Sequence, residues 1–239
     1  MDSHGHALVV RPDMKKNPKT ARELSRYYRR LLEDYGPQHW WPAETRFEVV
    51  IGAILTQNTA WTNVERAIAN LKRERLMTPE ALHRVSTRRL AGVIRPSGAF
   101  NIKAGRLKAF VRFLMEHYQG DWNRMLQEPV EVLRPRLLSV KGIGPETADS
   151  ILLYAGGVAI FVIDAYTRRV LDRHRLVSHR ASYDQLQRFF MDHLSAKANV
   201  YNEYHALLVK VGKEHCKRRP ICAGCPLEVF LNGKRPKIW

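Results

Sequence analysis

Residues 137–154 read LLSVKGIGPETADSILLY, in which two apolar stretches are joined by a turn with two glycines. The first apolar stretch ends at Val140, and Pro145 stands where a second helix would begin, since proline suits the first position of a helix. Gly142 and Gly144 allow main-chain N–H groups to approach a phosphate closely, because no side chain obstructs the approach. The stretch therefore predicts two helices joined by a hairpin that holds a phosphate backbone.

The charge of the chain indicates nucleic acid as the partner. Its 239 residues include 40 Lys and Arg against 23 Asp and Glu, which gives a formal net charge of +17. Such an excess favours a polyanion, and a hairpin of this kind holds double-stranded DNA without reading its sequence. The expected DNA contacts are Lys141, Gly142, Ile143 and Gly144.

Neither a membrane span nor a secretory signal is expected. No run of about 18 apolar residues occurs. The apolar run ALVV near the N-terminus is short and is followed by Arg11 and Pro12. A cytoplasmic, nucleoid-associated monomer is therefore expected.

The spacing of apolar residues predicts an all-α protein. Residues 47–55 show helical spacing, as most segments do, and strand-like alternation is scarce. Helix starts are expected at Thr20, at Thr78, and at Ser86 or Thr87, because these residue types cap helix N-termini. The length suits one sizeable domain or two small domains that share a cleft.

Asp164 is the first candidate for chemistry. It ends the apolar run AIFVI and precedes AYTRRVL, so one explanation is that it only caps the N-terminus of a helix. It also lies about 20 residues after the hairpin of a strongly basic chain. This combination favours the alternative, a carboxylate that acts on bound DNA.

The order of the motifs resembles a known family. GIGxxTA at 142–148, then V-x-D-x-x-x-R-R-V at 162–170, then a C-terminal cysteine cluster are similar to the helix-hairpin-helix DNA glycosylases of the endonuclease III superfamily. The resemblance extends over roughly residues 40–226. It implies that Asp164 is the catalytic carboxylate at the mouth of a cleft.

The same resemblance implies an all-α fold of two helical domains with this cleft between them. One domain is expected to be a helical barrel that contains the hairpin, at residues 45–157. The second is expected to combine the N-terminal segment 1–44 with residues 158–239.

Glu146 stands where bifunctional members of this family carry a nucleophilic lysine. A lysine amine attacks the sugar C1′ and forms an imine that leads to strand cleavage, whereas a carboxylate cannot form that imine. The sequence therefore predicts a monofunctional glycosylase without lyase activity. A plainer role for Glu146 is to complement the dipole of its helix. Lys141 could be proposed as a displaced amine, but its place before the glycines suits phosphate contact better.

Four blocks narrow the resemblance to the type III 3-methyladenine DNA glycosylases, a branch of this superfamily. They are WWP at 40–42, FEVVIGAILTQNT at 47–59, RPSGAFNIKAGRL at 95–107 and GIGPETADSILLYA at 142–155. The expected substrate is an alkylated purine such as 3-methyladenine, whose positive charge already weakens the glycosidic bond. Such a base needs an aromatic pocket, which attracts the cation, and one carboxylate.

The base pocket is expected to consist of three aromatic rings and one carboxylate: Trp40, Trp41, Phe47 and Glu146. Trp61 is a further candidate ring. A base that leaves the helix also leaves a gap in the stack. By resemblance, Gln57 and Asn58 are expected to fill this gap or to edge the pocket, the alternative being that they cap a helix C-terminus.

Cys216, Cys222 and Cys225 have the spacing C-x5-C-x2-C, close to the superfamily's four-cysteine iron–sulfur loop. The fourth ligand position is Leu231. Three interpretations remain open: a [4Fe-4S] cluster with an outside ligand such as His215 or solvent, a zinc site, or a metal-free loop. In each case the expected role is structural, organising the basic side chains Lys213, Lys217, Arg218 and Arg219.

Two other functions are compatible with these patterns. One is a glycosylase of the endonuclease III type that removes a mismatched or oxidised pyrimidine. The other is a non-catalytic protein that binds DNA structure through the hairpin and the basic surface. Asp164 favours catalysis over the second alternative.

Overall fold

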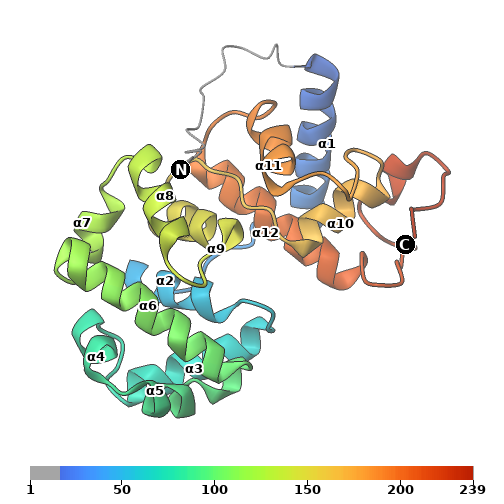
Figure 1. Ribbon diagram of the computed structural model, residues 1–239. Coiled ribbons are helices and arrows are strands. Elements are labelled where there is room, and N and C mark those ends of the chain that lie inside the picture. Colours follow the sequence, from blue (N-terminus) through green and yellow to red (C-terminus); the bar gives the residue numbers. More distant parts are fainter. Residues whose placement is uncertain (1–16, 239) are drawn as a thin grey trace, which may run out of the picture.

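The computed structural model describes residues 17–238, and every regular element in this range is a helix (Figure 1). This confirms the predicted all-α class. None of the described helices is long and apolar enough to cross a membrane. In chain order the elements are α1 Pro18–Tyr35, α2 Arg46–Leu55, α3 Trp61–Arg73, α4 Pro79–Arg84, α5 Thr87–Val93, η1 Arg95–Ser97, α6 Phe100–Tyr118, α7 Trp122–Leu126, α8 Val130–Ser139, α9 Pro145–Ser150, η2 Ile151–Ala155, α10 Ala165–Arg173, α11 Tyr183–Met191, α12 Ala198–Glu214 and η3 Glu228–Leu231.

Local capping chemistry accounts for the helix starts. Thr78 and Ser86 accept hydrogen bonds from the first turns of α4 and α5, as predicted. The predicted start at Thr20 is wrong, because Asn17 caps α1 by accepting a hydrogen bond from the Lys19 N–H at 3.0 Å. Pro18 then occupies the first helical position, which it favours, so the helix begins before Thr20.

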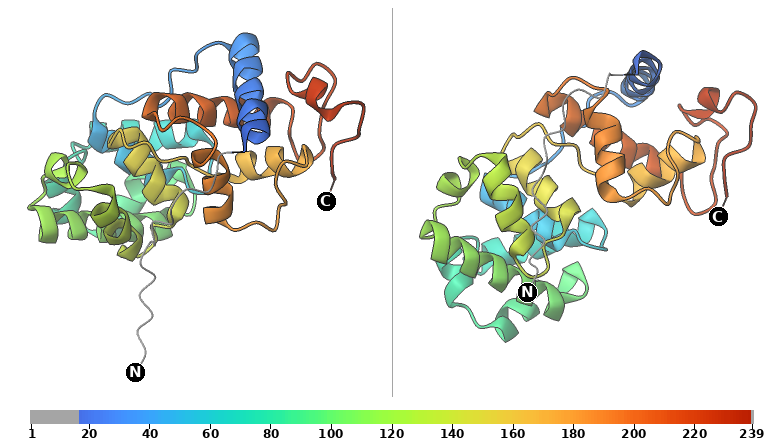
Figure 2. Two further views of the ribbon diagram at one scale, coloured as in Figure 1. Left: turned by 90° about the horizontal axis from the view of Figure 1, so that it is seen from above. Right: turned by 45° about the horizontal axis from the view of Figure 1, so that its top comes forward.

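The helices form two groups, and the first helix belongs with the last ones (Figures 1 and 2). α1 packs across α12, and the Tyr204 hydroxyl donates to the Leu24 carbonyl at 3.0 Å at this contact. α10 also packs on α12, whereas α2 to α9 form the other group. The segment from residue 17 therefore packs with the C-terminal helices, while residues 1–16 lie outside the described range. The boundaries at 44/45 and 157/158 stay a prediction.

α2 is the central helix of the larger group. All its residues from Phe47 to Leu55 are buried, which is typical of a helix surrounded by others. It packs against α3, α6, α9 and η2. Its one buried charge, Glu48, is paired with Lys72 at 2.9 Å. α2 ends at Leu55, and Gln57 just beyond it reaches the hairpin by donating to the Gly142 carbonyl.

The predicted hairpin is present between α8 and α9. Pro145 opens α9, and Gly142 occupies the turn with a φ of 91°, a conformation that glycine adopts at least cost. A Cβ at Gly142 would also lie 2.3 Å from Cγ of Arg106. Glycine is therefore required at this position by both backbone and packing.

A buried carboxylate ties the hairpin to the other group of helices. Asp149 on α9 is fully buried, and Arg134 on α8 donates two hydrogen bonds to it at 2.7 and 3.1 Å. The Tyr183 hydroxyl and the Gln187 amide, both on α11, donate to the same carboxylate at 2.9 and 2.7 Å. The Asp149 network thus connects α8, α9 and α11.

Replacing Asp149 by Asn is expected to lower the free energy of unfolding by about 3–5 kcal/mol, because the Arg134 guanidinium loses its charge partner while it remains largely buried. Urea denaturation at pH 7 measures this loss. The matched control is Glu74→Gln, which breaks an exposed pair with Arg89 at 3.2 Å. That change should cost at most about 1 kcal/mol. Equal losses in the two variants would contradict the importance given to the Asp149 network.

Candidate active site

Asp164 lies at the N-terminus of α10 and does cap this helix. Its Oδ1 accepts a hydrogen bond from the Thr167 N–H at 2.7 Å. The side chain is 12% exposed, so it is largely withdrawn from solvent without being sealed. The capping explanation from the sequence is therefore correct as far as Oδ1 is concerned. Oδ2 faces a different set of residues.

Glu146 is close enough to Asp164 for the two carboxyl groups to interact. The pKa of Glu146 is raised from 4.5 to about 7, first because surrounding protein desolvates it and second because of the charge on Asp164. Solvent nevertheless reaches the Glu146 side chain. Water moderates the desolvation, but both causes act in the same direction. Glu146 is thus a carboxyl group that keeps its proton to a higher pH than an ordinary glutamate.

Tyr154 and His205 complete the surroundings of Asp164, and the sequence had singled out neither. The Tyr154 hydroxyl and Nδ1 of His205 are 2.5 Å apart, and Nε2 of His205 is 3.8 Å from Oδ2 of Asp164. Burial lowers the pKa of His205, although Asp164 opposes this effect. Burial and then the Asp164 charge raise the pKa of Tyr154 well above 10. Both side chains are therefore neutral at pH 7.

A π-helical turn places Tyr154 in the site. The turn is η2, which directly continues α9 and contains Tyr154. π-helical turns of this kind occur frequently at functional sites. No sequence signal marks the turn, since ILLYA reads as an ordinary apolar helix.

A cluster of three tryptophans reaches Tyr154 through Trp41. Trp41 lies between its neighbours, with ring centroids 5.2 Å from Tyr154, 4.9 Å from Trp61 and 5.7 Å from Trp40. Trp40 and Trp41 are half-buried, and each has a buried indole N–H without a hydrogen-bond partner. The Trp40 indole nevertheless lies close enough to interact with the Tyr154 hydroxyl, which lowers the pKa of Tyr154 slightly against the larger effects of burial and charge. This tryptophan cluster, Trp40, Trp41 and Trp61, therefore offers ring surface and, at Trp41, an unpaired donor beside the acidic groups.

Phe47 and Lys213 lie elsewhere than the sequence suggested. Phe47 is only 3% exposed within the central helix α2, so its ring has little surface to offer a base. Its place in the base pocket stays a prediction. Lys213, expected in the basic loop, belongs to α12, and its ammonium lies 5.8 Å from the centre of the Trp40 ring.

Gln57 is bound to the hairpin. Its amide nitrogen donates to the Gly142 carbonyl at 3.0 Å and to the Thr147 hydroxyl at 2.8 Å, and its amide oxygen accepts from Arg106. Asn58 is exposed, with a φ of 53°. The two neighbours therefore differ: Gln57 holds the hairpin through hydrogen bonds, and Asn58 is exposed to solvent. The C-cap of α2 is Thr56 rather than this pair.

The four hairpin residues also differ in what they can offer a phosphate. Lys141 and Gly144 are exposed, and Gly142 is partly exposed. Ile143 is 4% exposed, and its N–H already donates to the Val140 carbonyl at 3.0 Å. Ile143 therefore fastens the turn to the core, while the two glycines and Lys141 form the accessible part.

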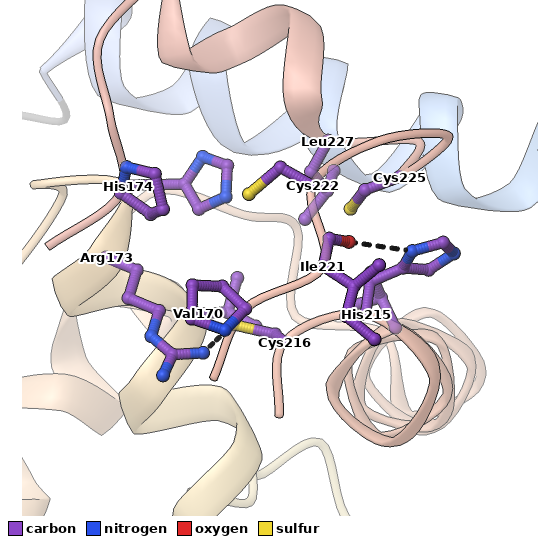
Figure 3. Close-up of a pocket in the computed structure, with 12 residues that line it drawn as sticks. Val170, Arg173, His174, His215, Cys216, Ile221, Cys222, Cys225 and Leu227 are labelled. Carbon is purple, nitrogen blue, oxygen red and sulfur yellow. Dashed lines mark hydrogen bonds between the residues drawn. The ribbon is translucent and has the colours of Figure 1, made fainter. Parts of the chain in front are cut away.

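The cysteine loop lines a small pocket at the far end of α10 (Figure 3). Arg173, at the end of α10, donates to the Cys216 sulfur at 3.2 Å and to the carbonyls of Lys217 and Arg218. Cys222 and Cys225 line the same pocket, and burial raises the pKa of both thiols. Nδ1 of His215 is occupied by the Ile221 carbonyl at 3.0 Å.

These residues do not fit a four-iron cluster. The pocket between them has a cavity volume of about 20 Å³, which is room for about one water molecule. Leu231, which stands at the fourth ligand position of the cysteine spacing, is an apolar residue in η3 and is 7% exposed. Among residues 17–238, no group of three or more His, Cys, Asp or Glu side chains is arranged to hold a metal ion. The structure thus shows three cysteines around one pocket and supports no step that uses a metal.

A hairpin that can receive phosphate, next to acidic and aromatic groups in a basic helical chain, defines a DNA-repair protein of the glycosylase class. A family model described as HhH-GPD superfamily base excision DNA repair protein matches residues 51–196. The chain belongs to this superfamily. MJ1434 of Methanocaldococcus jannaschii, provisionally named a DNA repair glycosylase, is 46% identical over 213 residues, which cover 88% of this chain and 96% of that protein.

Solved structures agree with this assignment. The 3-methyladenine DNA glycosylase MagIII of H. pylori, bound to 1,N6-ethenoadenine, has a TM-score of 0.70 and 29% identity over 82% of this chain and 97% of its own. An endonuclease III–DNA covalent intermediate has a TM-score of 0.76 over 88% of this chain and 94% of its own. At 21% identity, this second likeness shows the fold alone. The resemblance to the endonuclease III superfamily is confirmed.

The raised pKa of Glu146 gives a testable dependence of stability on pH. Between 4.5 and about 7 the folded protein holds a proton on Glu146 that the unfolded chain releases. The free energy of unfolding should therefore fall as the pH rises through this window, relative to a Glu146→Gln variant that cannot titrate. Urea denaturation of both proteins at half-unit pH steps measures the difference. Parallel curves from pH 4.5 to 7 would show that the Glu146 pKa is not raised.

Proposed function

We propose that the protein is a monofunctional DNA glycosylase that removes an alkylated purine, such as 3-methyladenine, from double-stranded DNA. One observation carries the proposal: Asp164 and Glu146 lie with neutral His205 and Tyr154 beside the tryptophan cluster. The chain as a whole is strongly positive, yet apart from Lys213 near the Trp40 ring the groups named here are acidic or neutral and aromatic. Such surroundings suit a cationic base and a cationic transition state.

The nature of the base follows from its charge. An alkylated purine such as 3-methyladenine is positively charged, so it leaves with little need for protonation. The faces of Trp40 and Trp41 attract such a cation by about 0.5–2 kcal/mol, and a nearby carboxylate adds to this attraction. The likeness to H. pylori MagIII, a 3-methyladenine DNA glycosylase, supports the same substrate class.

Asp164 is proposed to assist cleavage of the N-glycosidic bond. As the base departs, positive charge develops on the sugar, and a carboxylate nearby stabilises that charge or aligns the attacking water. The Thr167 N–H holds one carboxylate oxygen in place, so Asp164 need not reorganise during the reaction.

Glu146 is proposed to replace the lysine that makes related enzymes bifunctional. It belongs to the first turn of α9, beside Asp164, where an amine would be able to reach the sugar. A carboxyl group cannot form an imine with the sugar, so the product is an intact strand with an abasic site.

The proposed partner is damaged double-stranded DNA, bound by a monomer. Lys141 and the two hairpin glycines provide the phosphate contacts, and the net charge steers the chain to DNA. Lys217, Arg218 and Arg219 are exposed in the cysteine loop and add positive charge. The loop itself is proposed to be held by Arg173 and to take no part in the reaction.

Base release from defined duplexes tests the substrate class. The duplexes carry a methylated, deaminated, oxidised or mismatched base, and release of 3-methyladenine is expected to be fastest. Asp164→Asn should abolish release while DNA binding stays within about tenfold, because the carboxylate acts mainly in the transition state. Release of a pyrimidine but not of the methylated purine would show that the substrate is a damaged pyrimidine and not an alkylated purine. Undiminished release by a folded Asp164→Asn protein would remove this residue from the mechanism.

Borohydride trapping tests the monofunctional assignment. With a labelled abasic duplex, the natural protein should form no covalent complex and leave the strand intact. Glu146→Lys should allow at most weak trapping, because desolvation would leave part of its amine neutral whereas the Asp164 charge would favour the protonated form. A trapped complex with the natural protein that disappears in Lys141→Gln would overturn the assignment and identify Lys141 as the amine.

A further inference from the structure

His205 is a buried histidine with one ring nitrogen unaccounted for. Its side chain is 6% exposed in the middle of α12, and Nδ1 is paired with the Tyr154 hydroxyl. Nε2 is buried and has no hydrogen-bond partner. A buried polar atom left alone costs free energy, so this nitrogen calls for an explanation. The carboxylate oxygen Oδ2 of Asp164 lies 3.8 Å away.

Electrostatics determine which ring nitrogen carries the proton. Burial keeps both His205 and Tyr154 neutral, so the imidazole has one N–H. With the proton on Nδ1, the lone pair of Nε2 would face the Asp164 carboxylate and be repelled. With the proton on Nε2, the N–H points at Oδ2, and the Tyr154 hydroxyl donates to Nδ1. The second arrangement satisfies both neighbours.

We propose that His205 is a positioning residue for Asp164: its Nε2–H holds Oδ2 toward the reacting sugar, and Tyr154 fixes the tautomer that makes this possible. The role rests on the proposed glycosylase function. The Thr167 N–H already holds Oδ1, so His205 supplies the second constraint that stops the carboxylate from rotating.

The separation of 3.8 Å is longer than a hydrogen bond, which spans about 2.7–3.2 Å. Catalytic hydrogen bonds are often long in free enzymes and tighten in the substrate complex. A neutral donor also suits this site better than lysine or arginine would. It orients Asp164 without adding a positive charge where the sugar develops one.

Two substitutions separate the two ring nitrogens. A glutamine amide reaches the place of Nε2 and can still donate to Asp164, whereas an asparagine amide reaches only the place of Nδ1 and can serve only Tyr154. In single-turnover release of 3-methyladenine, His205→Asn should be slower by about 10- to 100-fold, the value of a hydrogen bond to a charged group. His205→Gln should stay within about fivefold of the natural protein.

A second histidine of the same kind provides the control. Nδ1 of His174 is paired with the Tyr27 hydroxyl at 3.0 Å, and the pocket that His174 lines is that of the cysteine loop. His174→Asn and His174→Gln should change thermal stability. Neither should change the rate at which the folded protein releases the base, compared with the natural protein. DNA affinity should be unchanged in all four variants. Equal losses of rate in His205→Asn and His205→Gln would overturn the positioning role.

The tautomer gives a readout that does not depend on activity. In 15N NMR spectra of the free protein, Nε2 of His205 should carry the proton and Nδ1 should show the shift of an acceptor. Tyr154→Phe should let the second tautomer appear. A proton on Nδ1 in the natural protein would overturn the proposal. If the natural protein releases no base, the proposed function fails. The NMR tautomer of His205 then tests by itself whether Nε2–H faces Asp164.

Discussion

The buried carboxylate of Asp149 is the constraint on which the site depends. It accepts hydrogen bonds from Arg134, Tyr183 and Gln187, and so joins both hairpin helices to α11. A buried charge is tolerated only when partners satisfy it, which makes this arrangement narrowly defined. Glu146 lies three residues earlier on the same short helix α9, whereas Asp164 begins α10 in the other group of helices. The distance between the two carboxyl groups is thus set by contacts outside the site.

Two carboxyl groups in different surroundings can take different protonation states. Asp164 accepts a backbone N–H at a helix N-terminus, where the dipole favours an anion. Glu146 has its pKa raised to about 7 by desolvation and by the Asp164 charge, although solvent reaches its side chain, so it is protonated more readily than an ordinary glutamate. The positive charge of the remaining chain brings DNA to the surface that carries these two carboxyl groups.

Local patterns in the sequence predicted those parts of the site that depend on neighbours along the chain. The hairpin follows from GIGP, and Asp164 follows from its place between an apolar run and a helix. Tyr154 and His205 escaped notice, because they meet across 51 positions and each sits in an apolar helical stretch typical of a core. The start of α1 was misplaced for a related reason: Asn17 and Thr20 are both good caps, and Pro18 decides between them.

The cysteine loop is held to the rest of the protein by contacts that involve no metal. The Arg173 guanidinium binds it by donating to the Cys216 sulfur and to two backbone carbonyls. Arg169, one turn earlier, donates to the Cys216 carbonyl. Both arginines belong to α10, which begins at the residue after Asp164 and ends at Arg173. One helix of about 13 Å therefore follows the proposed catalytic carboxylate at one end and contacts the basic loop at the other, so that the proposed chemistry and the proposed phosphate contacts share a single element.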